Sequence, residues 1–207
     1  MFSKAIQNAI DRLAKLPGIG PRHATRLVFH MLKMAGKDVD GLAGSITMLK
    51  EKIKTCPVCF AIFEILSDEQ KTCLICADPK RIKTSMCVIE KEADIEPIEK
   101  LGIFKGVYHV VGEHTDTLDK TVSPAVERLL ERVAYIKKQL PQEKQKEMEI
   151  ILATNATTEG DALASYLEKL LKPLGVTIAH LGRGLASGSE LEYADEQTLA
   201  YALKNRK

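Results

Sequence analysis

The first quarter of the chain carries apolar residues at helical spacing in three successive segments. They recur every three to four positions across residues 2–16, again after Pro21, and again across 40–54. The stretch PGIGP at residues 17–21 separates the first two segments, since glycine and proline interrupt a helix. Gly36 is expected to mark the end of the second helix. The apolar residues of the third segment are Leu42, Ile46, Leu49 and Ile53. The pattern predicts a helical hairpin followed by a third helix.

From about residue 86 the pattern changes to short apolar runs that alternate with helical stretches. The runs MCVIE, GVYHVVG, EIILAT and VTIAHLG lie at residues 86–90, 106–112, 149–154 and 176–182. The helical stretches lie near residues 92–101, 122–139, 159–171 and 195–204. Such alternation is typical of a mostly parallel β-sheet covered by helices. The larger part of the chain is therefore predicted to be an α/β domain.

Composition and charge indicate where the protein is located and what kind of partner it binds. The chain has 207 residues, of which 45% are apolar, which is enough to bury the core of one or two domains. No apolar run approaches the roughly 20 residues of a membrane span, and the first helix lacks the apolar core of a signal peptide. We therefore expect a cytoplasmic protein without a membrane partner. Residues 1–54 hold ten Lys and Arg against four Asp and Glu, a net charge of +6, while the remainder carries −4. This asymmetry indicates a polyanionic partner for the N-terminal part, or simply a solvated basic face.

Four cysteines form two pairs with the spacing of a metal site. Cys56 and Cys59 make one CxxC motif, and Cys73 and Cys76 make a second after thirteen residues. Two such turns bring four thiolates around one tetrahedral zinc ion and leave no open coordination position, so the zinc is expected to be structural. The alternatives are two disulfides or four buried thiols, which a reducing cytoplasm and so short a segment disfavour. Cys87, inside an apolar run, is expected to be a small core residue.

The turn between the first two helices has the features of a phosphate-binding site. Gly18 and Gly20 allow a sharp turn and leave backbone N–H groups free at the start of the second helix, where the helix dipole favours an anion. Arg22 and Arg26 lie one turn apart on that helix. The combination predicts binding to nucleic-acid phosphates without regard to base sequence. The alternative is an ordinary helical hairpin with a glycine turn.

Acidic and polar residues follow two of the predicted strands. Glu90 closes the run MCVIE, and an acid at that end of a strand binds Mg²⁺ where other carboxylates converge on it. The alternative is a charge that favours the start of the next helix. The loop at residues 154–158, TNATT, has the position of an active-site loop but contains no acid, histidine, lysine or cysteine. Glu159 and Asp161 come directly after it.

Taken in order, these motifs resemble the RecR family of bacterial recombination mediators. The resemblance rests on LPGIGPRHATRLVFHML, the four-cysteine motif, CVIE, GVYHVVG, ILATNATTEGDALA and GRGLASGSELEYADEQTLAYAL, which span essentially the whole chain. It implies a helix-hairpin-helix DNA-binding domain at 1–54, a four-cysteine zinc finger at 55–79 and an α/β Toprim domain at 80–175. Residues 176–207 would hold the last part of the Toprim sheet and a helical C-terminal extension.

The resemblance also implies a function. RecR-like proteins form dimers and tetramers whose ring acts as a DNA clamp on single- and double-stranded DNA. They work with RecO, and in many bacteria with RecF, to load RecA in recombinational repair, which places them at the nucleoid. On this chain Arg22 and Arg26 match the family's basic positions, with Lys15 and Arg12 as secondary candidates beside Gly18 and Gly20. Glu90 would lie near a RecO-binding surface.

Two departures and one rival function accompany the resemblance. Residues 113–124 read EHTDTLDKTVSP where the family usually continues with a glycine and an SPL-like turn. Ala186 and Ser189 stand where the family commonly has proline and glycine. Toprim enzymes pair a strand-end Glu with a DxD motif on a later strand to hold Mg²⁺, whereas here the later strand EIILAT runs into Thr154-Asn155-Ala156, whose side chains are neutral. We therefore expect no enzymatic activity; the alternative is a Mg²⁺-dependent Toprim enzyme that acts on DNA.

Overall fold

The computed structural model describes residues 2–112, 123–185 and 188–204. The departures at 113–122 and at Ala186 lie outside these residues. The chain folds as two compact units, Met1–Ile53 and Lys54–Lys207. None of the helices in the described ranges is both long and apolar enough to span a lipid bilayer.

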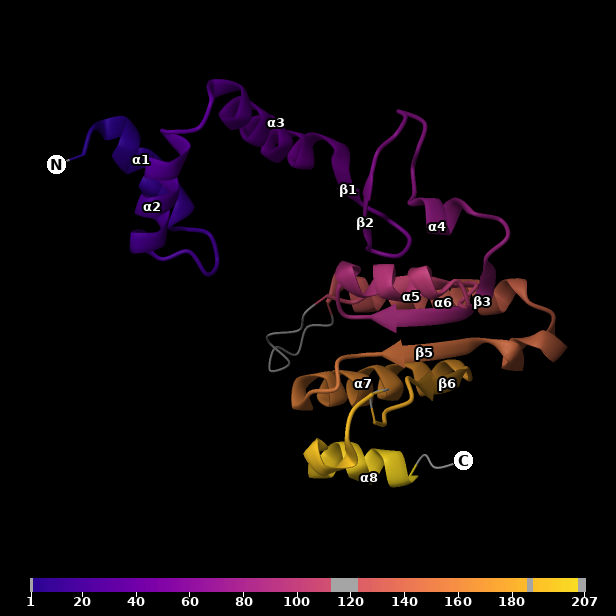
Figure 1. Cartoon of the computed structure of the whole chain (residues 1–207). Coiled ribbons are helices and arrows are strands. Elements are labelled where there is room, and N and C mark those ends of the chain that lie inside the picture. The colour runs from indigo at the N-terminus through magenta and orange to yellow at the C-terminus, as the bar shows by residue number, and fades with distance from the viewer. Residues whose placement is uncertain (1, 113–122, 186–187, 205–207) are drawn as a thin grey trace. The chain divides into compact units, whose positions relative to one another are not determined.

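The first unit consists of three helices, as predicted. They are α1 (Lys4–Leu13), α2 (Pro21–Met31) and α3 (Gly36–Lys52), drawn in indigo and violet in Figure 1. The Ser3 hydroxyl caps α1 by accepting a hydrogen bond from the Ile6 amide. Ile10 of α1 packs against Ala24 and Val28 of α2 in a small buried core. The prediction for Gly36 was wrong: it opens α3, because α2 already ends at Met31.

Helix α3 exposes the apolar stripe that its sequence predicts. No residue of the helix is buried, and Ile46 and Leu49 are 58% and 61% exposed. A stripe of this kind normally faces a partner, because exposed apolar surface gains free energy when it is covered.

The second unit begins with a small module around the cysteines. It contains β1 (Ile53–Thr55), β2 (Ile62–Glu64) and the single turn α4 (Leu74–Ala77), and β1 pairs with β2. These elements were not predicted from the sequence, because strands of three residues are too short to show a period.

A parallel four-stranded sheet forms the centre of the second unit, as predicted. Its strands are β3 (Ile82–Ile89), β4 (Gly106–Val110), β5 (Glu149–Ala153) and β6 (Thr177–His180), in the order β4-β3-β5-β6. The arrows of β3 and β5 point the same way in Figure 1. Strand β3 begins earlier than the apolar run, and the run did not show this part because Lys83, Thr84 and Ser85 are polar. The strand order reverses between β3 and β5, and in open α/β sheets ligands bind beyond the carboxyl ends of strands at such a point.

Helices cover both faces of this sheet. The described helices of the second unit, beyond α4, are α5 (Ile95–Leu101), α6 (Pro124–Gln139), α7 (Thr158–Leu171) and α8 (Glu196–Lys204), with 3₁₀ turns η1 (Glu92–Asp94), η2 (Gln142–Glu147), η3 (Lys172–Leu174) and η4 (Leu191–Tyr193). Helices α6 and α7 share one core with Met86 and Ile150 on one face. Helix α5 and the cysteine module share a second core with Cys87 and Tyr108 on the other face. Cys87 is a buried core residue, as predicted, and burial raises the pKa of its thiol to about 12.

The cysteine module closes the outer edge of β4, the first strand in the sheet. On that edge the Val110 amide donates to the Cys59 carbonyl at 2.8 Å, and the Tyr108 carbonyl accepts from Arg132 of α6 at 2.7 Å. An unpaired strand edge can pair with other chains and cause aggregation. These bonds satisfy two backbone groups on the outer edge of β4 and so protect it. The module is thus part of the α/β unit rather than an appended finger.

His109 of β4 is fully buried and held neutral. Its Nε2 donates to the Ala125 carbonyl at 2.8 Å, while Nδ1 has no partner among the described residues. Burial lowers the pKa of His109 from its ordinary value of 6.5 to about 4.

This shift predicts a loss of stability in mild acid. Between pH 6.5 and 4 the unfolded chain binds a proton at His109 and the folded chain does not, so the free energy of unfolding falls as the pH falls, by up to about 3 kcal/mol. Urea unfolding of the wild type and of His109→Gln across this range checks it. The variant should lose stability less steeply as the pH falls, because the two proteins differ only in the group at position 109. Parallel profiles would contradict the prediction.

Candidate functional site

The turn between α1 and α2 has the predicted geometry. Gly18 lies at a φ of 76°, which side-chain-bearing residues rarely adopt. Gly20 is the N-cap of α2, with Pro21 in the first turn and no side chain capping the helix. The first amides of α2 are thus free of a side-chain cap, and no atom lies within 4 Å of the position a Cβ would take on Gly20. A phosphate oxygen can approach these amides without a steric obstacle.

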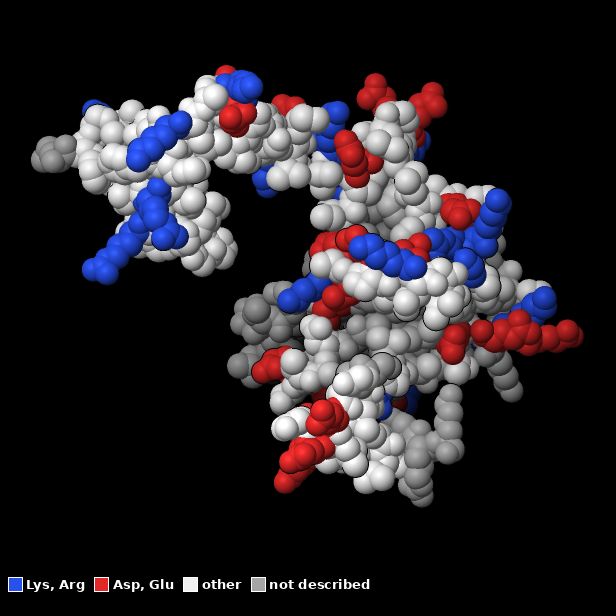
Figure 2. Space-filling view, viewed as in Figure 1, with Lys and Arg blue, Asp and Glu red and all other residues white. Residues whose placement is uncertain are grey.

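Basic side chains project around this turn. Arg12, Lys15, Arg22 and Arg26 are all exposed, and none forms an ion pair within the part of the chain that the structure describes. Arg26 contacts the His23 ring, with 3.2 Å between Nη2 and Nε2. On the face of α1 and α2 shown in Figure 2, the coloured side chains are blue. The turn is a positively charged surface of the first unit.

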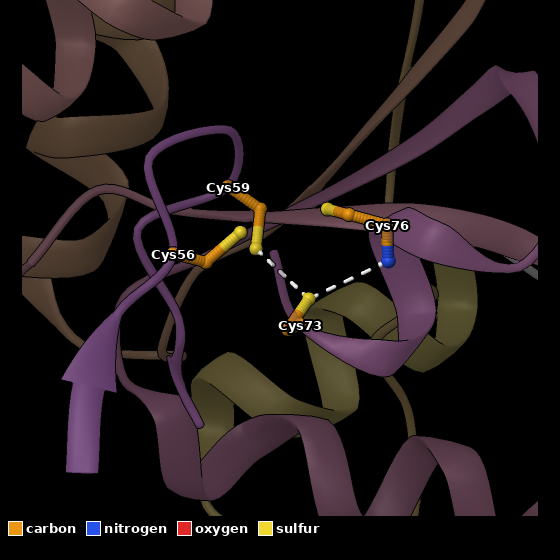
Figure 3. A group of neighbouring side chains, drawn as sticks. All are labelled: Cys56, Cys59, Cys73 and Cys76. Carbon is orange, nitrogen blue, oxygen red and sulfur yellow. Dashed lines mark hydrogen bonds between the residues drawn. The ribbon is translucent and has the colours of Figure 1, made fainter. Parts of the chain in front are cut away.

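The four cysteine sulfurs meet at one point. All lie within 4.8 Å of one another, and Cys56, Cys59 and Cys73 are buried (Figure 3). The Cys59 and Cys73 sulfurs are 3.6 Å apart, close to the roughly 3.8 Å between two sulfurs of a tetrahedral site with Zn–S bonds of about 2.3 Å. The Cys76 amide donates to the Cys73 sulfur at 3.4 Å.

The chemistry of these sulfurs suits a cation. The hydrogen bond between the Cys56 and Cys59 side chains lowers the pKa of Cys56 and raises the pKa of Cys59. This is expected when a thiolate is stabilised by a neighbouring S–H group. All five cysteines are free, so the alternative of two disulfides is not what the structure contains. Across residues 2–112, 123–185 and 188–204, this is the one group of three or more Cys, His, Asp or Glu side chains arranged to hold a metal.

Glu90 lies at the point where the strand order reverses, and both of its carboxylate oxygens are occupied. The Asn155 amide N–H donates to Oε1 at 2.7 Å, and the Asn155 side chain donates to Oε2 at 2.7 Å. Glu90 is only 9% exposed. These two bonds tie the end of β3 to the loop after β5 and occupy one acceptor position on each carboxylate oxygen, where a cation would otherwise bind.

The loop after β5 is held tightly in this position. The Thr157 hydroxyl caps α7 by accepting from the Gly160 amide at 3.1 Å. A Cβ on Gly160 would lie 2.1 Å from the Asn155 carbonyl oxygen, so only glycine fits beneath the loop. The neighbouring acid Asp161 pairs with Arg183 at 2.5 Å. Glu159 and Asp161 therefore do not gather around Glu90 as a cluster of carboxylates.

Three residues of these sites were missed from the sequence alone. Asn155 was noted as neutral, but its contact with Glu90 spans 65 positions. Arg132 donates to the Cys76 sulfur at 3.9 Å, and Arg128 to the Pro57 carbonyl at 3.2 Å. Both arginines belong to a charged stretch of α6 that looks like a solvated helix face, so the pattern carried no signal for either contact.

The chain is similar to known protein families along most of its length. Three family models match the chain: "RecR, helix-hairpin-helix" over residues 6–49, "Toprim domain" over 84–182, and "RecR, C-terminal" over 184–207. The first and second of these contain the glycine turn and the Glu90–Asn155 pair, respectively.

Full-length relatives carry one name. The chain is 39% identical over 207 residues to Recombination protein RecR of Paenarthrobacter aurescens, covering 100% of this chain and 98% of that protein. It is 41% identical over 212 residues to the protein of the same name from Acidothermus cellulolyticus, covering 100% and 98%. With the protein of that name from Deinococcus radiodurans the identity is 39% over 205 residues, covering 99% and 87%. Since motifs, fold and full-length identity coincide, the chain belongs to the RecR family.

Proposed function

We propose that this protein is a non-enzymatic, DNA-binding mediator of recombinational repair. It binds single- and double-stranded DNA through the turn between α1 and α2 and has a structural zinc ion and a Toprim site without catalysis. The observation that carries the proposal is the contrast between two sites. Arg22 is exposed beside the uncapped start of α2 and has no ion pair among the described residues, whereas each carboxylate oxygen of Glu90 accepts a hydrogen bond from Asn155.

The DNA contact follows from the charge of the first unit. Backbone amides at a helix start and guanidinium groups one turn apart bind phosphates, which are the same in every DNA sequence. Arg22 and Arg26 supply the main contacts, Lys15 and Arg12 extend them, and the glycine turn allows close approach. Binding is therefore independent of sequence and weakens with salt.

The metal proposed for the four cysteines is zinc, one ion per chain. Four thiolates within 4.8 Å of one another favour a soft or borderline cation, and a full set of protein ligands leaves no position for a reacting water. The ion would be held by Cys56, Cys59, Cys73 and Cys76. It would stabilise the fold and take no part in a chemical step.

The rival function is a Mg²⁺-dependent Toprim enzyme. Such chemistry needs several carboxylates around the cation, whereas Asn155 supplies two hydrogen-bond donors to Glu90 where an enzyme would have a second acid. Glu90 is better explained as the anchor of the loop after β5, on a surface that contacts a partner. A third class, a zinc module that binds only protein, leaves the basic turn without a role and predicts no DNA affinity at any salt concentration.

Replacing Asn155 with aspartate tests this assignment of the Glu90 site. Two carboxylates would then face each other, so without divalent cations the variant should lose about 2 kcal/mol of stability. Millimolar Mg²⁺ should restore it, because the cation would bridge the two acids. Thermal unfolding in EDTA and in Mg²⁺ measures the effect. Asn155→Ala removes the side-chain amide without adding an acid. It is the control, and its stability should not respond to Mg²⁺. A Mg²⁺-dependent stabilisation of the wild type that Glu90→Gln removes would contradict the proposal.

We further propose that the protein assembles into a dimer or tetramer ring that clamps DNA. The exposed stripe of α3 supports assembly, since Leu42, Ile46 and Leu49 are apolar, lie on one helix face and are exposed in the part of the chain that the structure describes. A second copy that covers the stripe would remove this surface from water.

A single charge on the stripe should weaken assembly. Ile46→Glu places a carboxylate in the middle of it and is expected to shift the mass measured by light scattering towards the monomer. Thr47→Glu adds the same charge about 100° away around the helix and should leave the mass unchanged. Equal masses for both variants and the wild type would show that α3 is not an assembly surface.

Partners and location complete the proposal. As a RecR-like mediator the protein would act with RecO, and with RecF as a further partner, to load RecA on DNA covered by single-strand-binding protein. It would work in the cytoplasm at the nucleoid. Pull-down of purified RecO by the wild type, and its loss in Glu90→Gln, would support a partner surface at the carboxyl edge of the sheet.

A further inference from the structure

Arg132 connects the cysteine site to the α/β sheet through one side chain. Its Nη2 donates to the Cys76 sulfur at 3.9 Å, and its Nη1 donates to the Tyr108 carbonyl on the outer edge of β4 at 2.7 Å. Arg132 comes from α6, on the opposite face of the sheet from the second core, to which Cys76 belongs. The guanidinium group therefore reaches past the edge strand to the metal ligands.

The charge of the metal site explains why a guanidinium group is favourable next to the Cys76 sulfur. Four thiolates around one Zn²⁺ ion carry a net charge of about −2. Three of the four cysteines are buried, so water solvates this charge poorly, and a buried charge without a partner is unfavourable. A guanidinium hydrogen bond to a ligand sulfur offsets part of it.

We propose that Arg132 is a positioning residue of the metal site, which stabilises the zinc-bound form and links it to the edge of β4. The inference rests on the proposed zinc ion. The Cys59 carbonyl accepts from the Val110 amide on the same edge. The metal ligands are therefore hydrogen-bonded to the edge of β4 twice, through Arg132 and through the first CxxC turn. Outer-shell hydrogen bonds to metal ligands typically change metal affinity by roughly 10- to 100-fold.

Arg128 provides a matched comparison one turn away. It also reaches the cysteine module from α6, donating to the Pro57 carbonyl, but it has no hydrogen bond to a cysteine sulfur in the described structure, and Glu131 pairs with its charge at 2.8 Å. Replacing Arg128 removes a contact between helix and module but no described hydrogen bond to a cysteine sulfur.

The experiment is a zinc competition with a colorimetric chelator on the purified full chain. Arg132→Gln should bind zinc about 10- to 100-fold more weakly than the wild type, and Arg128→Gln within about twofold of it. Wild-type affinity in Arg132→Gln, or an equal loss in Arg128→Gln, would overturn the proposal. Circular dichroism with saturating zinc checks that each variant is folded.

A second variant tests the role of Arg132 if the first does not fold, and the wild type tests the zinc ion itself. Should Arg132→Gln not fold, Arg132→Lys replaces it: lysine keeps the charge but has no planar fork to bond the Cys76 sulfur and the Tyr108 carbonyl together. Its zinc affinity should be at least about threefold below the wild type, and an unchanged affinity would overturn the proposal. A wild type that binds no zinc would instead refute the zinc ion itself, so the two failures are distinguishable.

Discussion

Replacing Cys56 with serine should abolish metal binding and destabilise the second unit more than any other single change described above. Cys56 is fully buried among the other three sulfurs, and a serine hydroxyl is a poor replacement for a thiolate ligand. The zinc content should fall from one equivalent per chain to near zero. The expected loss is about 4 kcal/mol or more, which lowers the Tm by roughly 10 °C or more.

The effect should extend to the sheet, because the cysteine module covers its edge. Without the metal, the Cys59 carbonyl is no longer held against the Val110 amide, and the exposed edge of β4 should make the variant aggregate on heating. Cys87→Ala is the control, since Cys87 is also buried but is not one of the four cysteines whose sulfurs meet. Cys87→Ala should keep one equivalent of zinc. A Cys56→Ser protein with the metal content and Tm of the wild type would refute the metal site.

The second large effect concerns DNA. Replacing Arg22 and Arg26 together by alanine should weaken binding by about 10- to 100-fold at 50 mM salt, because both side chains are exposed cations beside the glycine turn. The slope of log affinity against log salt should become less negative by about 2, one unit for each lost phosphate contact. Fluorescence anisotropy with labelled DNA measures both quantities.

A control pair of lysines distinguishes the effect of losing charge at the turn from the effect of losing the same charge elsewhere in the unit. Lys33→Ala with Lys37→Ala removes two positive charges from the same unit, beyond the end of α2 and away from the turn. This pair should lose no more than about threefold in affinity at the same salt. Equal losses in the two double variants would mean that the unit attracts DNA by net charge alone and that the turn has no particular role.

The features predicted correctly from the sequence are those that depend on neighbours along the chain. All five residues of β4 are buried, and a mostly apolar run identified the strand. The spacing of the cysteines identified their cluster, and the glycine turn identified the helical hairpin. In each case the residues that define the element lie within about twenty positions of one another.

The features that were missed depend on which strands are adjacent. Strands β3 and β5 pair so that Ile89 lies opposite Ala153, which brings Glu90 next to Asn155. Nothing local to either residue indicates this register. The same is true of Arg132 and Cys76, which are 56 positions apart. Periodicity predicted the apolar face of α3 but not whether the chain itself covers it.

The central claim, DNA binding without catalysis, is tested most directly by one gel experiment. The wild type is incubated with labelled DNA in EDTA and in Mg²⁺, and both the mobility shift and any change in the length of the DNA are recorded. The account predicts the same shift in both buffers and no product, because Glu90 is hydrogen-bonded to Asn155 and, among the described residues, belongs to no group arranged to hold a metal. Cleaved, joined or extended DNA that appears only with Mg²⁺, and disappears in Glu90→Gln, would contradict it.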